Sequence, residues 1–323
     1  MIHVLLPDDA LRPLPFYLAM EEYLAARGND DYFFMWQVEP TVIIGRNQHI
    51  LTEVNLEYCN RRGINVVRRK SGGGCVYADM NNVMFSYVTT SDAVVTTFSA
   101  YTAMVADMLC QLGVEAEAGG RNDILIHGRK VSGNAFYHKR GRAILHGTML
   151  YNTDISEMLH AITPSTQKLT SKGVESVRSR VINLNEVLDL TLDEFKRRSA
   201  SVLCDSELYL TAEDVEAIDR IAENYYSRQW LYGNSPRAMA GTTRRIEGVG
   251  EFDVSVSLKS DKIEHVDIKG DFFLLSDIDT MLLDRLKGVD YNRDAVVSVL
   301  SGVDVSTVIA SLDTKEFINL IIP

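Results

Sequence analysis

The spacing of apolar residues predicts a mixture of helices and strands in the first half of the chain. Phe16–Arg27 carries apolar residues roughly on one side of a helix, and Phe98–Leu112 has helical periodicity before Gly113, a common helix end. Short apolar runs bounded by turn residues are typical of strands. We predict strands over Asp31–Gln37, Thr41–Gly45, Ile64–Arg68, Asn82–Thr89, Asp123–His127, Lys130–Tyr137 and Ala143–Tyr151.

The second half of the chain is predicted to contain two capped helices and to end in a compact α+β segment. Thr191 and Glu194 have capping-box spacing before a helix, and Thr211 is predicted to cap a second helix that runs to about Trp230. A break marked by glycine and proline follows, so we expect a large domain over residues 1–240 and a small one over 247–323. The small domain is predicted to contain strands at Gly250–Leu258 and Lys262–Lys269 and helical stretches near Asp277–Leu286 and Asp294–Leu300.

Composition narrows the functional class. Apolar residues make up 46% of the 323 residues, enough for a core, and the net charge of 33 − 44 = −11 argues against general nucleic-acid binding. The sequence shows no secretory signal and no run near the ~18 apolar residues of a membrane span. The cysteines are scattered, which argues against a disulfide framework or structural zinc. We therefore expect a cytoplasmic protein without a membrane or nucleic-acid partner.

Positive charge is nevertheless clustered along this acidic chain. Local basic patches suit a small anionic ligand or an acidic protein partner. The third cluster, taken alone, is more typical of a solvated loop. The clusters are Arg61, Arg62, Arg68, Arg69 and Lys70; Lys168, Lys172, Arg178 and Arg180; and Lys139, Arg140 and Arg142.

A glycine-rich segment, Arg68–Tyr77 (RRKSGGGCVY), is the first candidate for chemistry. Three glycines after a strand let the main chain bend closely around a ligand, and their amides can line up on an anion. The segment is neither a Walker loop nor a dinucleotide fingerprint. Alone it is equally compatible with a plain turn, and the two arginines at its entrance favour phosphate binding.

The second candidate lies in a predicted hairpin that turns at His127–Gly128. Lys130 stands in a strand pattern followed by small residues, which suggests an ammonium group aimed at a ligand. Asp123 is a candidate Mg²⁺ ligand, because carboxylates and phosphate oxygens hold that ion. An exposed strand lysine and a hairpin-capping aspartate are the simpler interpretations. His146 follows in His146-Gly147-Thr148, where a histidine is usually a satisfied core or surface residue.

These segments, in this order, resemble the lipoate–protein ligase family, in its long form with a C-terminal accessory domain. RRKSGGGCVYADMNN is similar to the family's RRxSGGGAVxHDxGN, and GRNDILIHGRKVSGNAFYHKRGRAILHGTMLYNTD follows its pattern through the lysine and HGT. The other matching segments are TVIIGRNQH, LAMEEYL, TSKGVESVRSRVINL and WLYGNSP. The resemblance covers nearly the whole chain.

The resemblance implies an α/β (α+β) protein, with a mixed-sheet catalytic domain of the biotin and lipoate ligase type and a small accessory domain. It implies an ATP-dependent, AMP-forming ligase that uses Mg²⁺. The substrate would be lipoate, with octanoate left open. The partners would be acidic lipoyl carrier domains, namely 2-oxoacid dehydrogenase E2 subunits and the glycine cleavage H protein.

The resemblance also implies roles for individual residues. Catalytic roles fall to Lys130, Asp123 and Asn122, with Asp123 as the metal ligand. The residues implied to hold ATP or the adenylate are Arg69, Gly72, Gly73, Gly74, Cys75, Val76, Tyr77, Asn82, Lys130, Gly133, Ala135, Ser179 and Arg180. The residues implied to hold lipoate are Leu18, Met20, Glu21, Trp36, Gly73, Lys130 and His146.

Three positions depart from the family pattern. Ala78 replaces a histidine and alters one wall of the lipoyl pocket, and Asn81 replaces a glycine, which asparagine tolerates because it also accepts positive φ. Cys75 replaces an alanine and raises an alternative, an ATP-independent octanoyl or lipoyl transferase with Cys75 as nucleophile. A biotin ligase would show a GRGRxGR-type loop, which is absent. A non-enzymatic binding module would need neither Lys130 nor Asp123.

Overall fold

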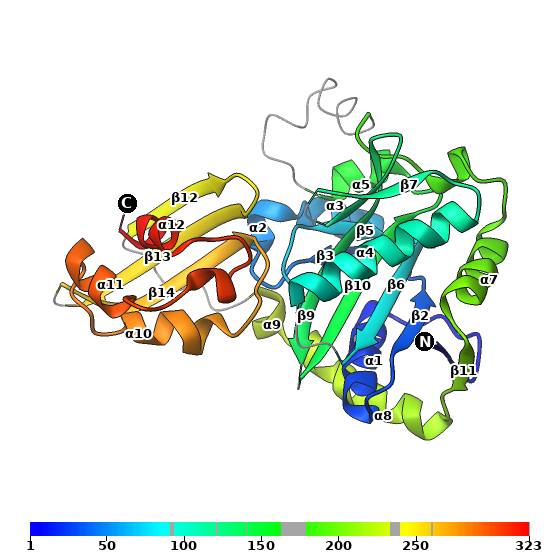
Figure 1. The fold of residues 1–323 in the computed structure, drawn as a ribbon, viewed down its shortest axis with the longest axis horizontal. Coiled ribbons are helices and arrows are strands. Elements are labelled where there is room, and N and C mark those ends of the chain that lie inside the picture. The colour runs from blue at the N-terminus through cyan, green and yellow to red at the C-terminus, as the bar shows by residue number, and fades with distance from the viewer. Residues whose placement is uncertain are drawn as a thin grey trace. The chain divides into compact units, whose positions relative to one another are not determined.

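The computed structural model describes residues 1–90, 94–120, 122–139, 141–162, 179–232, 240–259 and 261–322 (Figure 1). The chain divides into two compact units, each considered by itself below. Unit 1 consists of Met1–Ile44, Ile50–Arg69 and Cys75–Leu231. Unit 2 consists of Gly45–His49, Lys70–Gly74 and Tyr232–Pro323.

Unit 1 is built on an eight-stranded mixed sheet with the order β11-β1-β2-β6-β10-β9-β8-β7. β1 runs parallel to β2 and β11, and every other neighbouring pair is antiparallel. The strands are β1 (Ile2–Leu5), β2 (Tyr32–Trp36), β6 (Asn82–Thr89), β7 (Ala116–Gly119), β8 (Asp123–Ile126), β9 (Arg129–Lys139), β10 (Arg142–Leu150) and β11 (Ser206–Tyr209).

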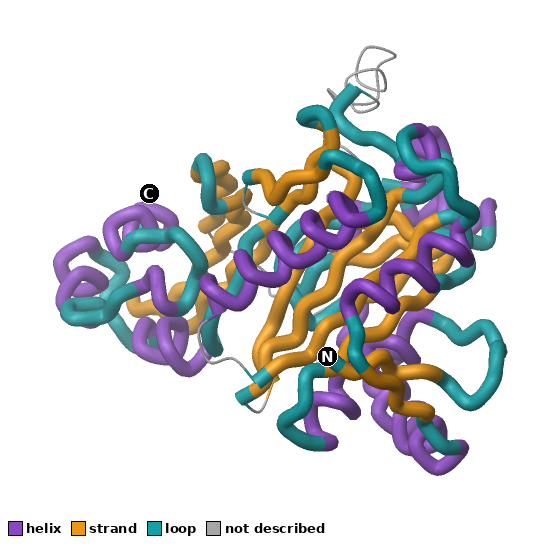
Figure 2. The backbone as a smooth tube through the Cα atoms, turned by 45° about the vertical axis from the view of Figure 1, so that its right-hand side comes forward, coloured by secondary structure: helices purple, strands orange, loops and turns teal. Residues whose placement is uncertain are grey.

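Helices cover both faces of this sheet because its side chains alternate between two apolar layers. Phe34, Trp36 and Met84 share a core with α1 (Leu14–Arg27) and α8 (Ala212–Ala222). The rings of Phe33 and Phe85 point the other way, toward Phe195 of α7. α4 lies on that second face and crosses the sheet (Figures 1 and 2). The bounds of these last two helices are Val94–Gln111 for α4 and Leu192–Leu203 for α7.

A second, three-stranded sheet in unit 1 has the order β4-β3-β5. Gly63, with φ of 67°, ends α3 in the left-handed conformation that glycine adopts readily, and the chain turns there into β4. The sheet packs on a small core that includes Val42, Cys59 and Tyr77. The strands of this sheet are β3 (Thr41–Ile44), β4 (Asn65–Arg68) and β5 (Val76–Ala78). The helices that contribute to the same core are α2 (Ile50–Glu53), α3 (Leu56–Arg62) and α5 (Ile155–Ala161).

The C-terminal part of unit 2 is an antiparallel meander, β12-β13-β14, covered by helices. Phe252 and Phe272 stack with ring centroids 4.8 Å apart at the centre of its core, together with the buried Phe317. Its strands are β12 (Ala240–Ile246), β13 (Gly250–Lys259) and β14 (Lys262–Asp271). Its helices are a π-helical turn (Asp279–Leu283), α10 (Asp284–Leu286), α11 (Arg293–Val299) and α12 (Thr314–Ile321).

Most of the predicted elements are present, and β6 has the predicted bounds. The predicted long helix after Thr211 is wrong, because α8 ends at Ala222 and two shorter pieces follow, a 3₁₀ turn at Glu223–Tyr226 and α9 at Arg228–Tyr232. Further 3₁₀ turns lie at Leu184–Glu186 and Val305–Thr307. Within the described ranges, no helix combines the length and apolarity that a membrane crossing requires.

Candidate active site

Strand register brings several of the predicted residues to one face of the large sheet. Asp123 pairs with Gly133, Gly133 with Thr148, Thr148 with Met84, and Met84 with Trp36. Directly paired residues in antiparallel strands point to the same side, so this row runs across five strands on the face that α1 covers. A second row on the same face contains His146, which pairs with Ala135 on one side and with Ser86 on the other.

Lys130 reaches this face because β9 carries a bulge. The register between β8 and β9 shifts after Ile124, so one extra residue of β9 is inserted and the side chain of Lys130 turns toward Asp123. The Lys130 ammonium lies 2.7 Å from the Asp123 carboxylate. Both side chains are about one-third exposed, so the pair remains open to a ligand.

The small residues after Lys130 make room for functional groups. A Cβ atom at Gly133 would lie 2.7 Å from the Lys130 ammonium, which therefore rests directly over the main chain there. A Cβ atom at Gly147 would meet the side-chain oxygen of Asn134 at 1.9 Å. Asn134 in turn exchanges hydrogen bonds with Asn122, through main-chain and side-chain groups at 2.8–3.1 Å. The two asparagines fix the start of β8, and hence Asp123.

A buried series of hydrogen-bonded polar side chains lies farther along the same face. Trp36 Nε1 donates to Ser86 Oγ at 2.9 Å, and Ser86 Oγ donates to Glu21 Oε1 at 2.7 Å. His146 Nδ1 lies 2.8 Å from the same oxygen. Glu21 is fully buried and His146 is 5% exposed. An ionised carboxylate only accepts hydrogen bonds, so an ionised Glu21 places the imidazole proton on Nδ1.

The apolar residues predicted to line the lipoate site share a core with Trp36 of this hydrogen-bonded series. Leu18 and Met20, both on α1, are buried in the same core as Trp36. Trp36 itself stacks on Tyr17, with ring centroids 5.0 Å apart. Since Tyr17 also belongs to α1, the helix holds the indole in a fixed orientation above the sheet.

Arg69 follows the last residue of β4 and is held by β3. Its amide donates to the carbonyl of Ile44 at 2.9 Å, and its Nη1 donates to the carbonyl of Ile43 at 3.1 Å. The side chain is only 5% exposed. A guanidinium group fixed in this way keeps little rotational freedom, as a preorganised anion ligand requires.

Cys75, which precedes β5, and the first two residues of that strand alternate in direction. Val76 packs toward the core under α1, whereas Cys75 and Tyr77 pack into the small core beneath α3. Burial raises the pKa of the Cys75 thiol, with Arg69 opposing that effect only partly. A nucleophilic cysteine needs a lowered pKa, and the shift at Cys75 is in the opposite direction.

The glycine loop belongs to unit 2. The Gly73 amide donates to the carbonyl of Phe272 at 3.1 Å, and Gly73 has φ of 83°. A Cβ atom at Gly72 would meet that same carbonyl at 2.2 Å, and one at Gly74 would contact Asp271 at 3.4 Å. The main chain of unit 2 therefore requires glycine at position 72, whatever ligand the loop binds.

Comparisons with known proteins agree with this geometry. Residues 13–203 match the family described as the lipoyl protein ligase A/B catalytic domain, and residues 235–321 match the bacterial lipoate protein ligase C-terminus. The chain is 37% identical to lipoate-protein ligase LplJ of Bacillus subtilis over 317 residues, covering 94% of this chain and 95% of that protein. The chain belongs to the lipoate–protein ligase family.

Solved structures of other ligases share the fold. P. falciparum LipL1 in complex with lipoate aligns with a TM-score of 0.79 at 18% identity, over 99% of this ligase and 98% of that chain. Lipoate-protein ligase A bound with ATP aligns at 0.62 and 25% identity, over 72% and 98%. The bipartite ligase of Thermoplasma acidophilum, from a study with its E2 lipoyl domain, aligns at 0.65 and 25%, over 74% and 98%.

The remaining residues predicted to bind the nucleotide differ in exposure: Ser179 and Arg180 are exposed, and Asn82 is buried. Arg180 is brought to Lys130, whose amide donates to the Arg180 carbonyl at 2.8 Å, and Ser179 precedes it on the exposed surface. Asn82 is fully buried and bonds to Thr153 and to the Tyr77 carbonyl, so it holds the turn between β5 and β6. Its contact with ATP stays a prediction. Outside the described residues lie Arg121, Arg140, Lys168, residues 170–178, Gly233 and Pro236.

The basic residues between positions 61 and 70 do not form one exposed patch in this ligase. Arg68 and Arg69 are each 5% exposed, and Arg62 pairs with Glu157. Desolvation, together with the nearby charge of Arg46, lowers the pKa of Lys70 to about 8. The cluster therefore combines buried and paired residues with the exposed Arg61.

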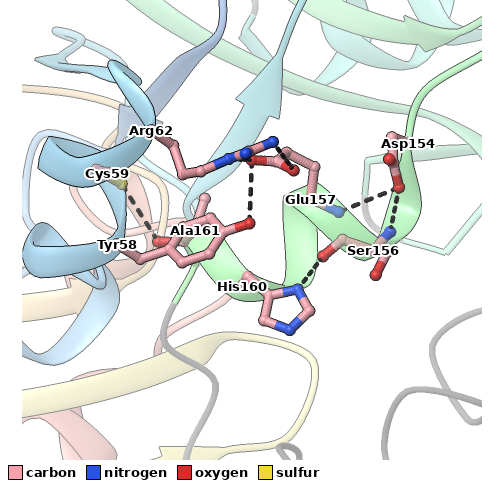
Figure 3. Close-up of polar contacts among 8 residues, drawn as sticks. All are labelled: Tyr58, Cys59, Arg62, Asp154, Ser156, Glu157, His160 and Ala161. Atoms are coloured by element: carbon pink, nitrogen blue, oxygen red, sulfur yellow. Dashed lines mark hydrogen bonds and ion pairs between the residues drawn. The ribbon is translucent and has the colours of Figure 1, made fainter.

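Sequence reasoning missed the polar cluster that joins α3 to α5 (Figure 3). Arg62 donates to both carboxylate oxygens of Glu157 at 3.0 and 3.1 Å, and Tyr58 donates to one of them at 3.0 Å. The hydrogen bond from Arg62 lowers the pKa of the Glu157 carboxyl. Asp154 caps α5 by accepting from two main-chain amides. Because Arg62 and Glu157 lie 95 residues apart, no local signal in the sequence points to the pair.

Asp123 fits the metal that the family implies. Mg²⁺ is commonly held by one or two carboxylates together with substrate phosphates, so a single carboxylate, about one-third exposed and beside Lys130, is a suitable protein contribution. Among the described residues, no group of three or more His, Cys, Asp and Glu side chains is arranged to hold a metal ion.

Proposed function

We propose that this ligase activates lipoate with Mg·ATP to give lipoyl-AMP and then transfers the lipoyl group to a lysine of a carrier domain. The observation that carries the proposal is the common face of the sheet: the Lys130–Asp123 pair and the buried Trp36–Ser86–Glu21–His146 chain lie on it together. The first group suits a phosphate and a carboxylate, and the family resemblance assigns Trp36, Glu21 and His146 of the second group to lipoate. The family membership supports the same assignment.

In the first step the lipoate carboxylate attacks the α-phosphorus of ATP. A bond forms between the carboxylate oxygen and the α-phosphorus, and the bridging bond to the β-phosphate breaks, so pyrophosphate leaves with its electron pair. Lys130 lies between the two anions and offsets the charge that builds on the α-phosphate, with Arg69 as a second fixed cation. Mg²⁺ held by Asp123 would neutralise further phosphate charge.

In the second step the amine of a carrier lysine attacks the acyl carbon of the mixed anhydride. A carbon–nitrogen bond forms, the bond from the acyl carbon to the phosphate oxygen breaks so that AMP leaves with the electron pair, and the amine loses its proton to solvent. The nucleophile comes from the partner, so the ligase needs no nucleophile of its own. A related ligase was studied with its E2 lipoyl domain, which supports E2 subunits as carriers; the H protein, the use of octanoate and a cytoplasmic location are further proposals.

The transferase alternative is not favoured. It requires the Cys75 thiolate to reach an acyl substrate, and Cys75 instead packs into the core beneath α3 with a raised pKa. The similarity over both family regions, including the C-terminal one, also points to the ATP-using ligases.

Lipoate-dependent exchange of labelled pyrophosphate into ATP tests the first step alone. Lys130→Ala removes the cation between the two anions, and we expect a loss of at least about 100-fold in exchange, as for other preorganised charge contacts. Lys262→Ala is the matched control, because Lys262 pairs with Asp290 on the surface of unit 2. Exchange at the wild-type rate in Lys130→Ala would reject the assignment of Lys130.

A further inference from the structure

Three hydrogen bonds lock Arg68 to the segment that ends unit 1. Arg68 Nε and Nη2 both donate to the carbonyl oxygen of Leu231, at 3.0 and 2.7 Å. In return, Trp230 Nε1 donates to the carbonyl oxygen of Arg68 at 2.9 Å. Each bond joins two residues that lie 162 or 163 positions apart in the sequence. Arg68 is 5% exposed. We call Arg68, Trp230 and Leu231 the junction clamp.

The clamp stands at two of the three points where the chain leaves unit 1. One departure follows Arg69 and begins the glycine loop, and the other follows Leu231 and begins the linker to the C-terminal domain. Arg68 bonds directly to Leu231, so the two departures start from one fixed place in unit 1. A displacement of Leu231 therefore acts on the segment that carries Arg69.

The clamp is built to resist displacement. Desolvation lowers the pKa of Arg68 to about 10, so the group is still a cation at neutral pH and needs its acceptors inside the protein. Trp230 packs edge-on against Tyr225, with ring centroids 6.2 Å apart, and joins the core under α1. Withdrawing the Leu231 carbonyl would leave a buried charge short of two hydrogen bonds.

We propose that Arg68 is a positioning residue for adenylate formation: through the junction clamp it holds Arg69 in place for the α-phosphate. The proposal rests on the proposed function. Arg69 is held by β3 on one side, through the carbonyls of Ile43 and Ile44, and by its neighbour Arg68 on the other. Loosening the clamp removes the second of these supports.

Two conservative variants and a matched control test the clamp. Trp230→Phe keeps an aromatic ring but removes the indole donor, and Arg68→Lys keeps the charge but loses the forked pair of donors. Arg142→Lys is the control, because Arg142 is also buried and also donates to main-chain carbonyls, those of Gly28 and Asp30, away from the clamp. KM for ATP, KM for lipoate and the midpoint of thermal unfolding are measured for each, using pyrophosphate exchange.

The clamp predicts a selective effect on the nucleotide. KM for ATP should rise about fivefold or more in both Trp230→Phe and Arg68→Lys, as expected for one lost hydrogen bond, while KM for lipoate stays within about twofold. The double variant should be no worse than the more affected single variant, because both changes open the same clamp. Arg142→Lys should lower the unfolding midpoint without changing KM for ATP.

Two results would overturn the proposal. One is an unchanged KM for ATP in both clamp variants while the wild type exchanges pyrophosphate, which rejects the clamp alone. The other is an equal rise in Arg142→Lys, which would show that general destabilisation causes the effect. A wild type that catalyses no lipoate-dependent exchange would reject the proposed function itself, and the role of Arg68 with it.

Discussion

Gly133 decides where the Lys130 ammonium lies, because its single hydrogen leaves room for the lysine side chain. In Gly133→Ala the new Cβ would lie 2.7 Å from Lys130 Cε and Nζ, so the flexible end of the lysine must move. We expect pyrophosphate exchange to fall roughly 10-fold through misplacement of the ammonium. The free energy of unfolding should change by less than about 1 kcal/mol, because alanine is tolerated in a strand.

Gly28→Ala is the matched control for this substitution. A Cβ atom there would meet only the Tyr32 hydroxyl, at an ordinary 3.6 Å, so both activity and stability should be retained. Wild-type exchange in Gly133→Ala would show that the position of Lys130 over the main chain is not important for the reaction.

Cys75 gives a second test at the scale of single residues. Cys75→Ala should keep most of the ligation activity, because alanine is as small and the proposed reaction forms no acyl-enzyme. Cys75→Leu should lose activity by overpacking the core beneath α3. The raised thiol pKa also predicts alkylation by iodoacetamide more slowly than at the exposed Cys110. An ATP-independent activity that disappears in Cys75→Ala would move this ligase to the transferases.

At the scale of residues, the sequence points to residues within motifs more readily than to the residues that hydrogen-bond to them. Lys130, Asp123 and His146 were singled out because they stand in recognisable segments, and strand register brings them to one face. Ser86 could not be found in this way, because its role depends on pairing with His146, a residue 60 positions away in a strand whose register is set by tertiary structure.

At the scale of elements, Asp214 joins α8 to α1. Burial by itself would raise the pKa of this carboxyl, but hydrogen bonds from the Thr211 main chain, Tyr23 and Arg27 outweigh it and lower the pKa to about 2. The folded pKa is below the unfolded value of about 3.9, so the stabilisation is present above about pH 4 and is lost as the pH falls toward 2. Its size is on the order of 2 kcal/mol.

Urea unfolding of Asp214→Asn measures this contribution. The free energy of unfolding should fall by about 1–2 kcal/mol at pH 7, and the difference from wild type should shrink between pH 4 and pH 3. Asp193→Asn is the control, an exposed aspartate in the first turn of α7 whose change should stay within about 0.5 kcal/mol. A difference that does not depend on pH would assign the effect to packing instead of the charge.

Long periodic elements were predicted well, whereas several of the short ones were missed. α1, α4 and β6 each contain enough apolar residues for their period to be evident. β1, β7 and β11 have four residues each, too few to show a period, and their pairing partners decide that they are strands. The helix predicted after Thr211 failed for a related reason, because nothing in the apolar pattern marks its end at Ala222.

At the scale of the whole molecule, the two units are interlaced in sequence. Gly45–His49 and Lys70–Gly74 belong to unit 2 although most of their neighbours along the chain belong to unit 1. A division of the sequence at one break, such as 1–240 and 247–323, follows composition and cannot reveal this arrangement. The hydrogen bond from Gly73 to Phe272 spans about 200 positions and arises only in the folded chain.

The central claim is that this ligase joins lipoate to a carrier lysine at the expense of ATP. The most direct measurement is the intact mass of a lipoyl carrier domain after incubation with the ligase, lipoate and Mg²⁺, with and without ATP. We predict one added lipoyl group per carrier only when ATP is present, and none when the acceptor lysine is replaced. Modification without ATP, or none with ATP in the presence of competent carriers, would contradict the account.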